Sequence, residues 1–278
     1  MEFQKGRLLS EFSTFGIGGE IAHFVEVHTF EEMEEAYSSD LPKIVIGKGS
    51  NCLFGDAPFV GLAILNKIDF TDWEGSNLFC GSGTSFSLIG VQSARKKLSG
   101  LEFASGIPAT VGGAVFMNAG ANGSETADSL KSVLFFDGKK RREILREELV
   151  FGYRKSPFQK MDGVILAARF SLKGKEEARK KQLEIISYRM RTQPLKEKSA
   201  GCVFQNPPGR SAGALIEQCG LKGLQIGGAK VSEMHANFIV NSKWASAEDV
   251  KKLIELVREK VFQQTGVLLE TEIRLINA

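Results

Sequence analysis

Glycine is concentrated in short clusters, and this feature constrains the fold more than any other. The chain has 30 glycines among 278 residues, about 11% against an average near 7%. They gather at residues 16–19, 47–49, 81–83, 106–113, 120–123 and 220–228. Glycine lets the backbone turn tightly and approach a ligand closely. Any one cluster is typical of an ordinary turn, but several together indicate backbone that surrounds a ligand.

Composition places the chain among globular proteins and argues against several classes of function. Hydrophobic residues make up 42% and charged residues 25%, so a folded chain is expected. The net charge of +3, from 36 basic and 33 acidic residues, indicates no nucleic-acid or membrane binding. Apolar stretches such as residues 59–65 are too short to span a bilayer, and the first residues lack a secretion signal. We therefore expect a cytoplasmic protein.

Cysteine and histidine spacing predicts no metal site. The cysteines, at positions 52, 80, 202 and 219, include no Cys-x-x-Cys pair, so neither zinc nor a redox dithiol is indicated. The three histidines are few and scattered along the chain.

Hydrophobic periodicity and capping signals predict alternating helices and strands. Thr29 and Glu32 form a capping box before a helix, and Ser246 with Asp249 caps another. Further helices are expected at residues 85–98, 176–189 and 211–219. Strands are expected at residues 43–46, 62–65, 133–136, 164–170, 237–241 and 268–275. Residues 106–123 carry few charges and many small side chains, which indicates buried irregular backbone.

Several familiar ligand-binding fingerprints are absent. The glycine loops at residues 16–21 and 47–52 lack the third glycine of a dinucleotide fingerprint. No phosphate-binding Gly-Lys-Ser/Thr loop and no nucleophile elbow occur. What remains is Gly47-Lys48-Gly49-Ser50-Asn51 after a strand, where backbone N–H groups can form a nest for pyrophosphate. The second glycine-rich segment, residues 106–121, is suited to line a flat aromatic cofactor and to offer main-chain hydrogen bonds.

In this order, the motifs resemble those of one enzyme family, the UDP-N-acetylenolpyruvoylglucosamine reductases (MurB). The resemblance runs over nearly the whole chain, and the chain is similar to the compact form of the family. The matching segments are Thr14–Gly19, Gly47–Asn51, Gly106–Gly123, Phe151–Ser156, Gln193–Leu195, Ser199–Pro207, Gly220–Gly223, Ile226–Ala229 and Leu269–Arg274.

The resemblance implies an α+β fold with a two-subdomain FAD-binding part of the vanillyl-alcohol-oxidase (PCMH) type. It implies FAD-binding subdomains at residues 1–66 and 67–192, and a substrate-binding α+β domain at residues 193–278. It also implies that NADPH reduces FAD, which then reduces UDP-N-acetylglucosamine enolpyruvate to UDP-N-acetylmuramate for peptidoglycan synthesis. A monomer is expected.

The resemblance also assigns site residues. Arg154 matches the catalytic arginine, and a guanidinium suits a carboxylate that gains charge in the transition state. Glu272 matches the catalytic glutamate that stabilises the enol form or orients the proton donor. Substrate contacts are expected from Tyr153, Gln193, Asn206 and His235. Cofactor contacts are expected from Gly47, Lys48, Gly49, Ser50, Asn51, Gly106, Ile107, Pro108, Val111, Gly112, Gly113, Ala114, Asn118, Ala119, Gly120 and Ile165.

Two positions depart from the family pattern. Cys202 stands where the family usually has a proton-donating serine; a thiol, with a reference pKa of about 8.5, is the stronger acid. We expect Cys202 to act as the general acid, the alternative being a buried filler in an impaired enzyme. Gln205 stands where lysine is common, so one positive charge near the substrate phosphates is missing.

Three other interpretations stay open from the sequence. The chain could be an FAD oxidoreductase of the same fold with another substrate, although the set of arginine, thiol and glutamate argues against it. It could be a non-catalytic binder of flavin or sugar nucleotide. A Cys202–His235 nucleophilic pair for hydrolysis would leave the glycine-rich segments unexplained.

Overall fold

The computed structural model describes residues 3–276, and these divide into two compact units. The first unit contains residues 3–4, 23–48 and 61–189. The second contains residues 5–22, 49–60 and 190–276. Two N-terminal segments therefore fold with the C-terminal residues, a grouping that no single boundary in the sequence expresses.

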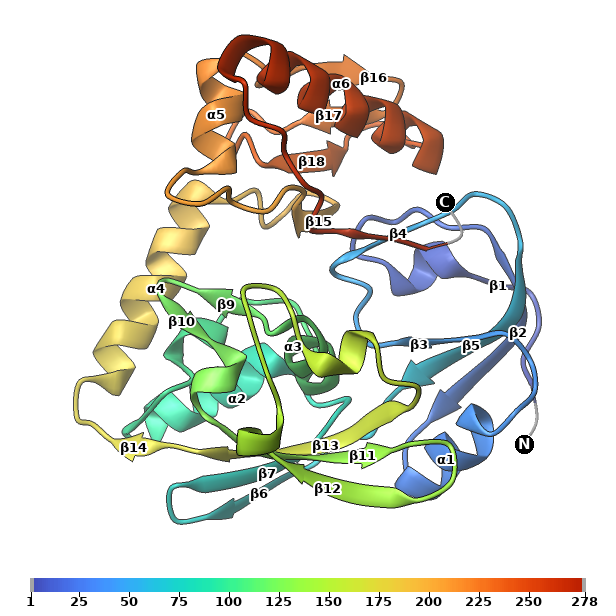
Figure 1. Cartoon of the computed structure of the whole chain (residues 1–278), viewed down its shortest axis with the longest axis vertical. Helices are drawn as coiled ribbons and strands as arrows, with labels where there is room; N and C mark the ends of the chain where they lie inside the picture. Colours follow the sequence, from blue (N-terminus) through green and yellow to red (C-terminus); the bar gives the residue numbers. More distant parts are fainter. Residues whose placement is uncertain (1–2, 277–278) are drawn as a thin grey trace. The chain divides into compact units, whose positions relative to one another are not determined.

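An antiparallel sheet of order β12-β11-β13-β7-β6 forms the centre of the first unit (Figure 1). Residues Phe135 and Ile165 are paired in its register, so the predicted strands at 133–136 and 164–170 are confirmed. The strands are β6 (Thr71–Glu74), β7 (Asn77–Gly81), β11 (Leu130–Phe136), β12 (Arg141–Leu145) and β13 (Val164–Ser171).

Both faces of this sheet are buried at its central strand β13. Neighbouring residues of one strand point to opposite sides, so successive residues of β13 enter different cores. Ile165 packs in an apolar core with residues of α2 (Phe86–Arg95) and α3 (Val111–Met117). The next residue, Leu166, packs in a separate core with residues of α1 (Phe30–Tyr37). The central strands β11 and β13 thus form a common wall between two apolar cores, and each contains an apolar run of at least four residues.

A second, smaller group of strands in this unit contains a parallel pair. Strand β3 (Lys43–Ile46) lies parallel to β5 (Phe59–Asn66), and β5 lies next to β2 (Glu20–Val27). The glycine loop at residues 47–51 follows β3 and leads to β4 (Cys52–Phe54). The strands predicted at residues 43–46 and 62–65 are confirmed as β3 and part of β5, whereas β4 was not predicted.

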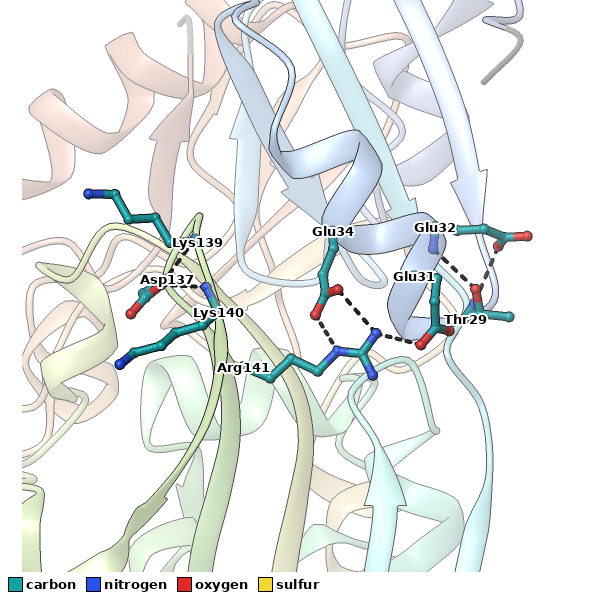
Figure 2. Close-up of polar contacts among 8 residues, drawn as sticks. All are labelled: Thr29, Glu31, Glu32, Glu34, Asp137, Lys139, Lys140 and Arg141. Carbon is teal, nitrogen blue, oxygen red and sulfur yellow. Dashed lines mark hydrogen bonds and ion pairs between the residues drawn. The ribbon is translucent and has the colours of Figure 1, made fainter.

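Helix α1 begins as the sequence predicts, and it is tied to strand β12 by charge. Glu32 N donates to Thr29 Oγ1 at 3.1 Å in the capping box. Figure 2 shows Arg141 of β12 reaching both Glu31 and Glu34 of α1. The hydrogen bond from Arg141 is the largest cause that lowers the pKa of Glu31. Glu31 is largely exposed, so this contact orients the helix more than it stabilises the fold.

The second unit is built on an antiparallel sheet of order β15-β18-β17-β16. The helices α5 (Ala212–Gln218) and α6 (Ala247–Thr265) pack with it around one apolar core. The capping box of Ser246 and Asp249 is confirmed, and α6 ends at Gly266 with φ +67°. The strands are β15 (Ser199–Cys202), β16 (Gln225–Ile226), β17 (Ala229–Val231) and β18 (Phe238–Asn241).

Shorter elements complete the chain. Helix α4 (Ala178–Thr192) matches the charged helix predicted at residues 176–189; it begins two residues later and ends three residues later than predicted. The paired short strands are β1 (Arg7–Leu8) with the start of β2, β8 (Leu98–Ser99) with β14 (Lys173–Gly174), β9 (Gly120–Ala121) with β10 (Ser124–Glu125), and β4 with β19 (Arg274–Ile276). The 3₁₀ turns are Leu9–Phe12, Glu102–Ala104, Thr126–Asp128, Arg146–Glu148 and Pro157–Gln159.

Three sequence predictions are wrong in detail. Residues 106–123 are not irregular throughout, because Thr110 caps α3 by accepting from Gly113 N. Helix α2 ends at Arg95 rather than near Leu98. The expected strand at 268–275 is a strand only from Arg274, and Leu275 is 48% exposed, so the sequence alternation does not mark a buried face there.

Among residues 3–276, no helix combines the length and apolar character that crossing a membrane requires.

Candidate functional site

The loop at residues 47–51 presents a row of backbone donors. The N–H groups of Lys48, Gly49, Ser50 and Asn51 donate no hydrogen bond to another residue in the described part of the chain. Gly49 has φ +56°, a left-handed conformation. Successive N–H groups at such a turn form a concave nest that binds an anion. The donor set therefore fits a pyrophosphate.

Two segments of the first unit, around Ser85 and Thr110, lie beside Gly47 and Lys48. A Cβ on Gly47 would lie 2.4 Å from Oγ1 of Thr110, so the loop contacts the start of α3 closely. Lys48 Nζ donates to Ser85 Oγ at 3.1 Å. Ser85 in turn forms a β-bridge with Thr110.

The segment Ser82–Ser85 is a part of this arrangement that the sequence reasoning missed. Its carbonyl groups accept hydrogen bonds from the first turn of α3: Gly112 N donates to Ser82 O at 2.8 Å, and Val111 N donates to Thr84 O at 2.9 Å. The sequence did contain a signal, because residues 81–83 are one of the glycine clusters.

The main-chain donors of the second glycine-rich segment are used by the protein itself. Besides Val111 and Gly112, the N–H groups of Ile107 and Ala109 donate to backbone carbonyls, and Gly106 N donates to Ser87 Oγ at 2.7 Å. The N–H groups of these residues therefore have partners within the protein, which leaves their carbonyl groups as the main-chain groups that can bond a cofactor. They can contact a flat ring only through their Cα atoms, side chains and carbonyl groups.

Two of the predicted cofactor residues have structural contacts. Ile165 is 6% exposed and lies in the apolar core described above. Asn118 is fully buried and follows α3 in a left-handed conformation with φ +45°. Its Nδ2 donates to Gly152 O at 2.9 Å, and its Oδ1 accepts from Ala127 N at 3.1 Å. The Asn118 side chain thus holds the turn that carries Arg154.

Arg154 lies in a tight turn of the first unit. Gly152 and Lys155 exchange two backbone hydrogen bonds of 3.0 and 2.9 Å, and Arg154 has φ +56°. Its Nη2 donates to Gly120 O at 3.0 Å, and its guanidinium lies 5.0 Å from the ring centroid of Tyr153. A guanidinium held in this way is oriented before any ligand arrives, which is what stabilising a developing negative charge requires.

Cys202 and Glu272 are brought together within the second unit by backbone pairing. Glu272 N donates to Val203 O at 2.7 Å, directly beside Cys202. Phe204 and Thr271 form a β-bridge, and Gln205 Nε2 donates to Thr271 O at 3.3 Å. Residues about 70 positions apart in the sequence therefore lie on adjacent extended segments.

Two asparagines fix these segments. Asn237 is 3% exposed, and its side chain accepts from Phe204 N at 2.9 Å and donates to Phe204 O at 2.8 Å. Asn51 Nδ2 donates to Glu272 O at 3.2 Å. Asn51 therefore links the loop at residues 47–51 to the segment that carries Glu272. Asn237 was not predicted, since a buried structural amide leaves no signal in one sequence.

The predicted substrate residues of the second unit differ in their surroundings. Gln193 has a buried Oε1 with no hydrogen-bond partner among residues 3–276. Asn206 Oδ1 accepts from Ala212 N at 3.0 Å at the start of α5. Burial is the largest cause that lowers the pKa of His235. Its Nδ1 accepts from Asn237 N at 3.2 Å, so in the neutral ring the proton lies on Nε2.

Within residues 3–276 no three His, Cys, Asp or Glu side chains are grouped so that they could hold a metal ion.

Comparison with known proteins identifies two parts of the chain. Residues 26–140 match the family described as "FAD binding domain". Residues 193–276 match "UDP-N-acetylenolpyruvoylglucosamine reductase, C-terminal domain".

Similar proteins carry one name. The UDP-N-acetylenolpyruvoylglucosamine reductase of Protochlamydia amoebophila is 53% identical, covering 99% of this chain and 94% of that protein. The enzyme of the same name from Chlamydia muridarum is 48% identical, covering 96% and 92%. The crystal structure of this reductase (MurB) from Thermus caldophilus is 40% identical, with a TM-score of 0.87, covering 99% of this chain and all of that chain. With its FAD-binding domain and α+β fold, the chain belongs to the UDP-N-acetylenolpyruvoylglucosamine reductases, flavin-dependent oxidoreductases of peptidoglycan synthesis.

Proposed function

We propose that residues 47–51 hold the pyrophosphate of FAD, and that residues 82–85 and 106–120 line its flavin. The unpaired N–H groups of Lys48–Asn51 support the first assignment. Gly106, Ile107, Pro108, Val111, Gly112, Gly113, Ala114, Ala119 and Gly120 contact the cofactor through Cα and carbonyl groups, because most of their donors are engaged. Asn118 and Ile165 support this wall from behind.

NADPH is the reductant in this proposal. Bound FAD would supply hydride chemistry, passing a hydride from NADPH to the enolpyruvyl double bond of UDP-N-acetylglucosamine enolpyruvate. Addition of one hydride and one proton across this double bond gives UDP-N-acetylmuramate. Arg154 binds the substrate carboxylate and stabilises the charge that it gains during hydride addition.

The proton comes from Cys202. Its thiol donates the proton to the carbon next to the one that receives the hydride, and Glu272 orients the donor or stabilises the enol form. The observation that carries this assignment is the backbone pairing of the two segments, since Glu272 N donates to Val203 O beside Cys202. Pairing of this kind fixes the spacing of the two residues along their backbones.

The remaining substrate contacts compensate for Gln205, which supplies no charge. Gln193, Asn206 and His235 of the second unit bind the nucleotide and its phosphates. The buried, unpartnered Oε1 of Gln193 supports this role, because it needs a donor that a ligand can provide. Tyr153 contacts the substrate next to Arg154. Its exposed ring supports this role.

We also infer the organisation and location of the enzyme. Residues 193–278 form the substrate domain, and residues 1–66 and 67–192 form the two FAD-binding subdomains; the family match that begins at residue 193 supports this boundary. The protein acts as a monomer. The reaction takes place in the cytoplasm, where NADPH and nucleotide-linked sugars are available.

Two substitutions of Cys202 test the proton donor. Cys202→Ala keeps FAD and is reduced by NADPH at the normal rate, but turnover falls by about 10²-fold or more, the usual contribution of a general acid. Cys202→Ser retains activity because the hydroxyl can donate from the same position. The measurement is anaerobic stopped-flow absorbance of the flavin, first with NADPH and then with the enolpyruvyl substrate.

The matched control is Cys219→Ala, which removes a half-buried thiol at the end of α5. We expect normal rates in both half-reactions. If Cys202→Ala reoxidises its flavin with the substrate as fast as the unmodified enzyme, the general-acid assignment is wrong. If the protein never binds FAD, the assignment of residues 47–51 and 106–120 fails instead.

A further inference from the structure

The C-terminal end of α3 and the turn of Arg154 share one hydrogen-bond network. Carbonyl groups at the end of a helix have no partner within it. Here Phe116 O accepts from Ser156 Oγ at 2.6 Å and from Gln159 Nε2 at 3.0 Å. Two side chains that follow the turn in sequence therefore fasten it to α3.

Gln159 connects this helix end to Arg154 itself. The same Nε2 donates to Arg154 O at 3.0 Å. An amide nitrogen carries two hydrogens, so the two carbonyl groups of Phe116 and Arg154 match its donors. It also lies 3.7 Å from Met117 Sδ.

The backbone of Arg154 needs such a support. A non-glycine residue with positive φ costs about 1 kcal/mol or more and persists only where its surroundings fix it. On one side of the turn, Asn118 holds Gly152 O at 2.9 Å. On the other side, Gln159 holds Arg154 O. The two amides thus fix the turn at both ends.

We propose that Gln159 is a positioning residue for the reductase reaction. It holds the guanidinium of Arg154 at a fixed position relative to α3, and hence relative to the segment at residues 106–114. It lies outside the segment Phe151–Ser156 that carries the family resemblance. This inference rests on the proposed role of Arg154.

The test uses three variants and separates the two half-reactions. In Gln159→Ala, FAD content and reduction by NADPH stay normal, while reoxidation by UDP-N-acetylglucosamine enolpyruvate slows by about tenfold, since small displacements of a positioned group cost one to two orders of magnitude. Arg154→Ala is the reference and slows reoxidation further. Gln263→Ala is the control. Its exposed amide on α6 donates only to Glu259 among the described residues, and both half-reactions stay normal.

Gln159→Glu provides a readout that a purely structural role does not move. A carboxylate at this position faces two carbonyl oxygens and repels them, whereas a protonated carboxyl can donate one hydrogen bond. The reoxidation rate of Gln159→Glu therefore rises as the pH falls, relative to Gln159→Ala measured at each pH. If Gln159→Ala is poorly folded, the pH profile of Gln159→Glu relative to the unmodified enzyme still decides the question.

The outcomes are distinguishable. Normal reoxidation in Arg154→Ala refutes the proposed role of Arg154, on which this inference rests. Slow reoxidation in Arg154→Ala with a normal rate in Gln159→Ala overturns the present inference alone. Equal slowing of both half-reactions in Gln159→Ala, loss of FAD, or a Gln159→Glu profile parallel to that of Gln159→Ala also overturns it, because each indicates a structural role.

Discussion

Substitution of Gly49 by alanine tests whether the loop at residues 47–51, the proposed pyrophosphate site, requires glycine for its conformation or for the space around it. Gly49 has φ +56°, and a Cβ there would lie 2.0 Å from the backbone O of Phe12 and 3.0 Å from Cα of Ser13. Gly75 has φ +58° in the β6–β7 turn, with no atom within 4 Å of its added Cβ. The two glycines therefore share a conformation and differ in their surroundings.

The magnitudes follow from this difference. Alanine in a left-handed conformation costs about 1–2 kcal/mol, and Gly75→Ala measures this strain alone. In Gly49→Ala the neighbour that must move is backbone, which cannot rotate away. Overpacking of this kind adds about 1–3 kcal/mol. We expect Gly49→Ala to lower the free energy of unfolding by about 2–5 kcal/mol, out of the 5–15 kcal/mol of a typical domain.

The assay is equilibrium urea unfolding of the apoprotein, followed by far-ultraviolet circular dichroism for both variants. FAD binding is measured separately by quenching of flavin fluorescence. Gly49→Ala should weaken FAD binding because the loop must move away from Phe12, whereas Gly75→Ala should leave it unchanged. Equal destabilisation by the two substitutions would refute the reasoning, since it would show that the close approach to Phe12 does not require glycine.

Two further predictions concern the second unit. Asn237→Ala leaves the N–H and C=O of Phe204 buried and unpaired, at about 1–3 kcal/mol for each group. Urea unfolding should show that the free energy of unfolding falls by about 2–6 kcal/mol, and a fall below about 1 kcal/mol would contradict the structure. Gln225→Ala, which removes an exposed amide bound to Gly227 O, is its control and should change the free energy of unfolding by less than about 0.5 kcal/mol. Burial lowers the pKa of His235. As the pH falls below the ordinary histidine pKa of about 6.5, the unfolded chain therefore binds a proton at His235 before the folded chain does. The contribution of the neutral ring to the free energy of unfolding is complete above this pH and is lost below it. A ring titration of His235 by NMR with a midpoint at or above 6.5, or a pH dependence of unfolding that is unchanged in His235→Gln, would exclude this assignment.

The sequence determined the local elements of this protein and the family to which it belongs. Capping residues such as Thr29 and Ser246 mark where helices begin, because their side chains bond the first backbone donors of the same helix. The ordered motifs, from the loop at 47–51 to the segment around Glu272, indicated the reductase family, since each is a short local pattern that can be recognised in the sequence alone.

Tertiary structure decided what no local pattern contains. Three contacts join residues that meet only in the folded chain. These are the hydrogen bonds from the first turn of α3 to Ser82 and Thr84, the pairing of the Cys202 and Glu272 segments, and the hydrogen bond from Gln159 to Arg154. The grouping of residues 5–22 and 49–60 with the C-terminal unit is likewise invisible in the linear order. The physical reason is that a backbone N–H group or a side-chain amide is chemically the same wherever it stands in the sequence. Only the folded chain decides whether its hydrogen-bond partner is the protein or a ligand.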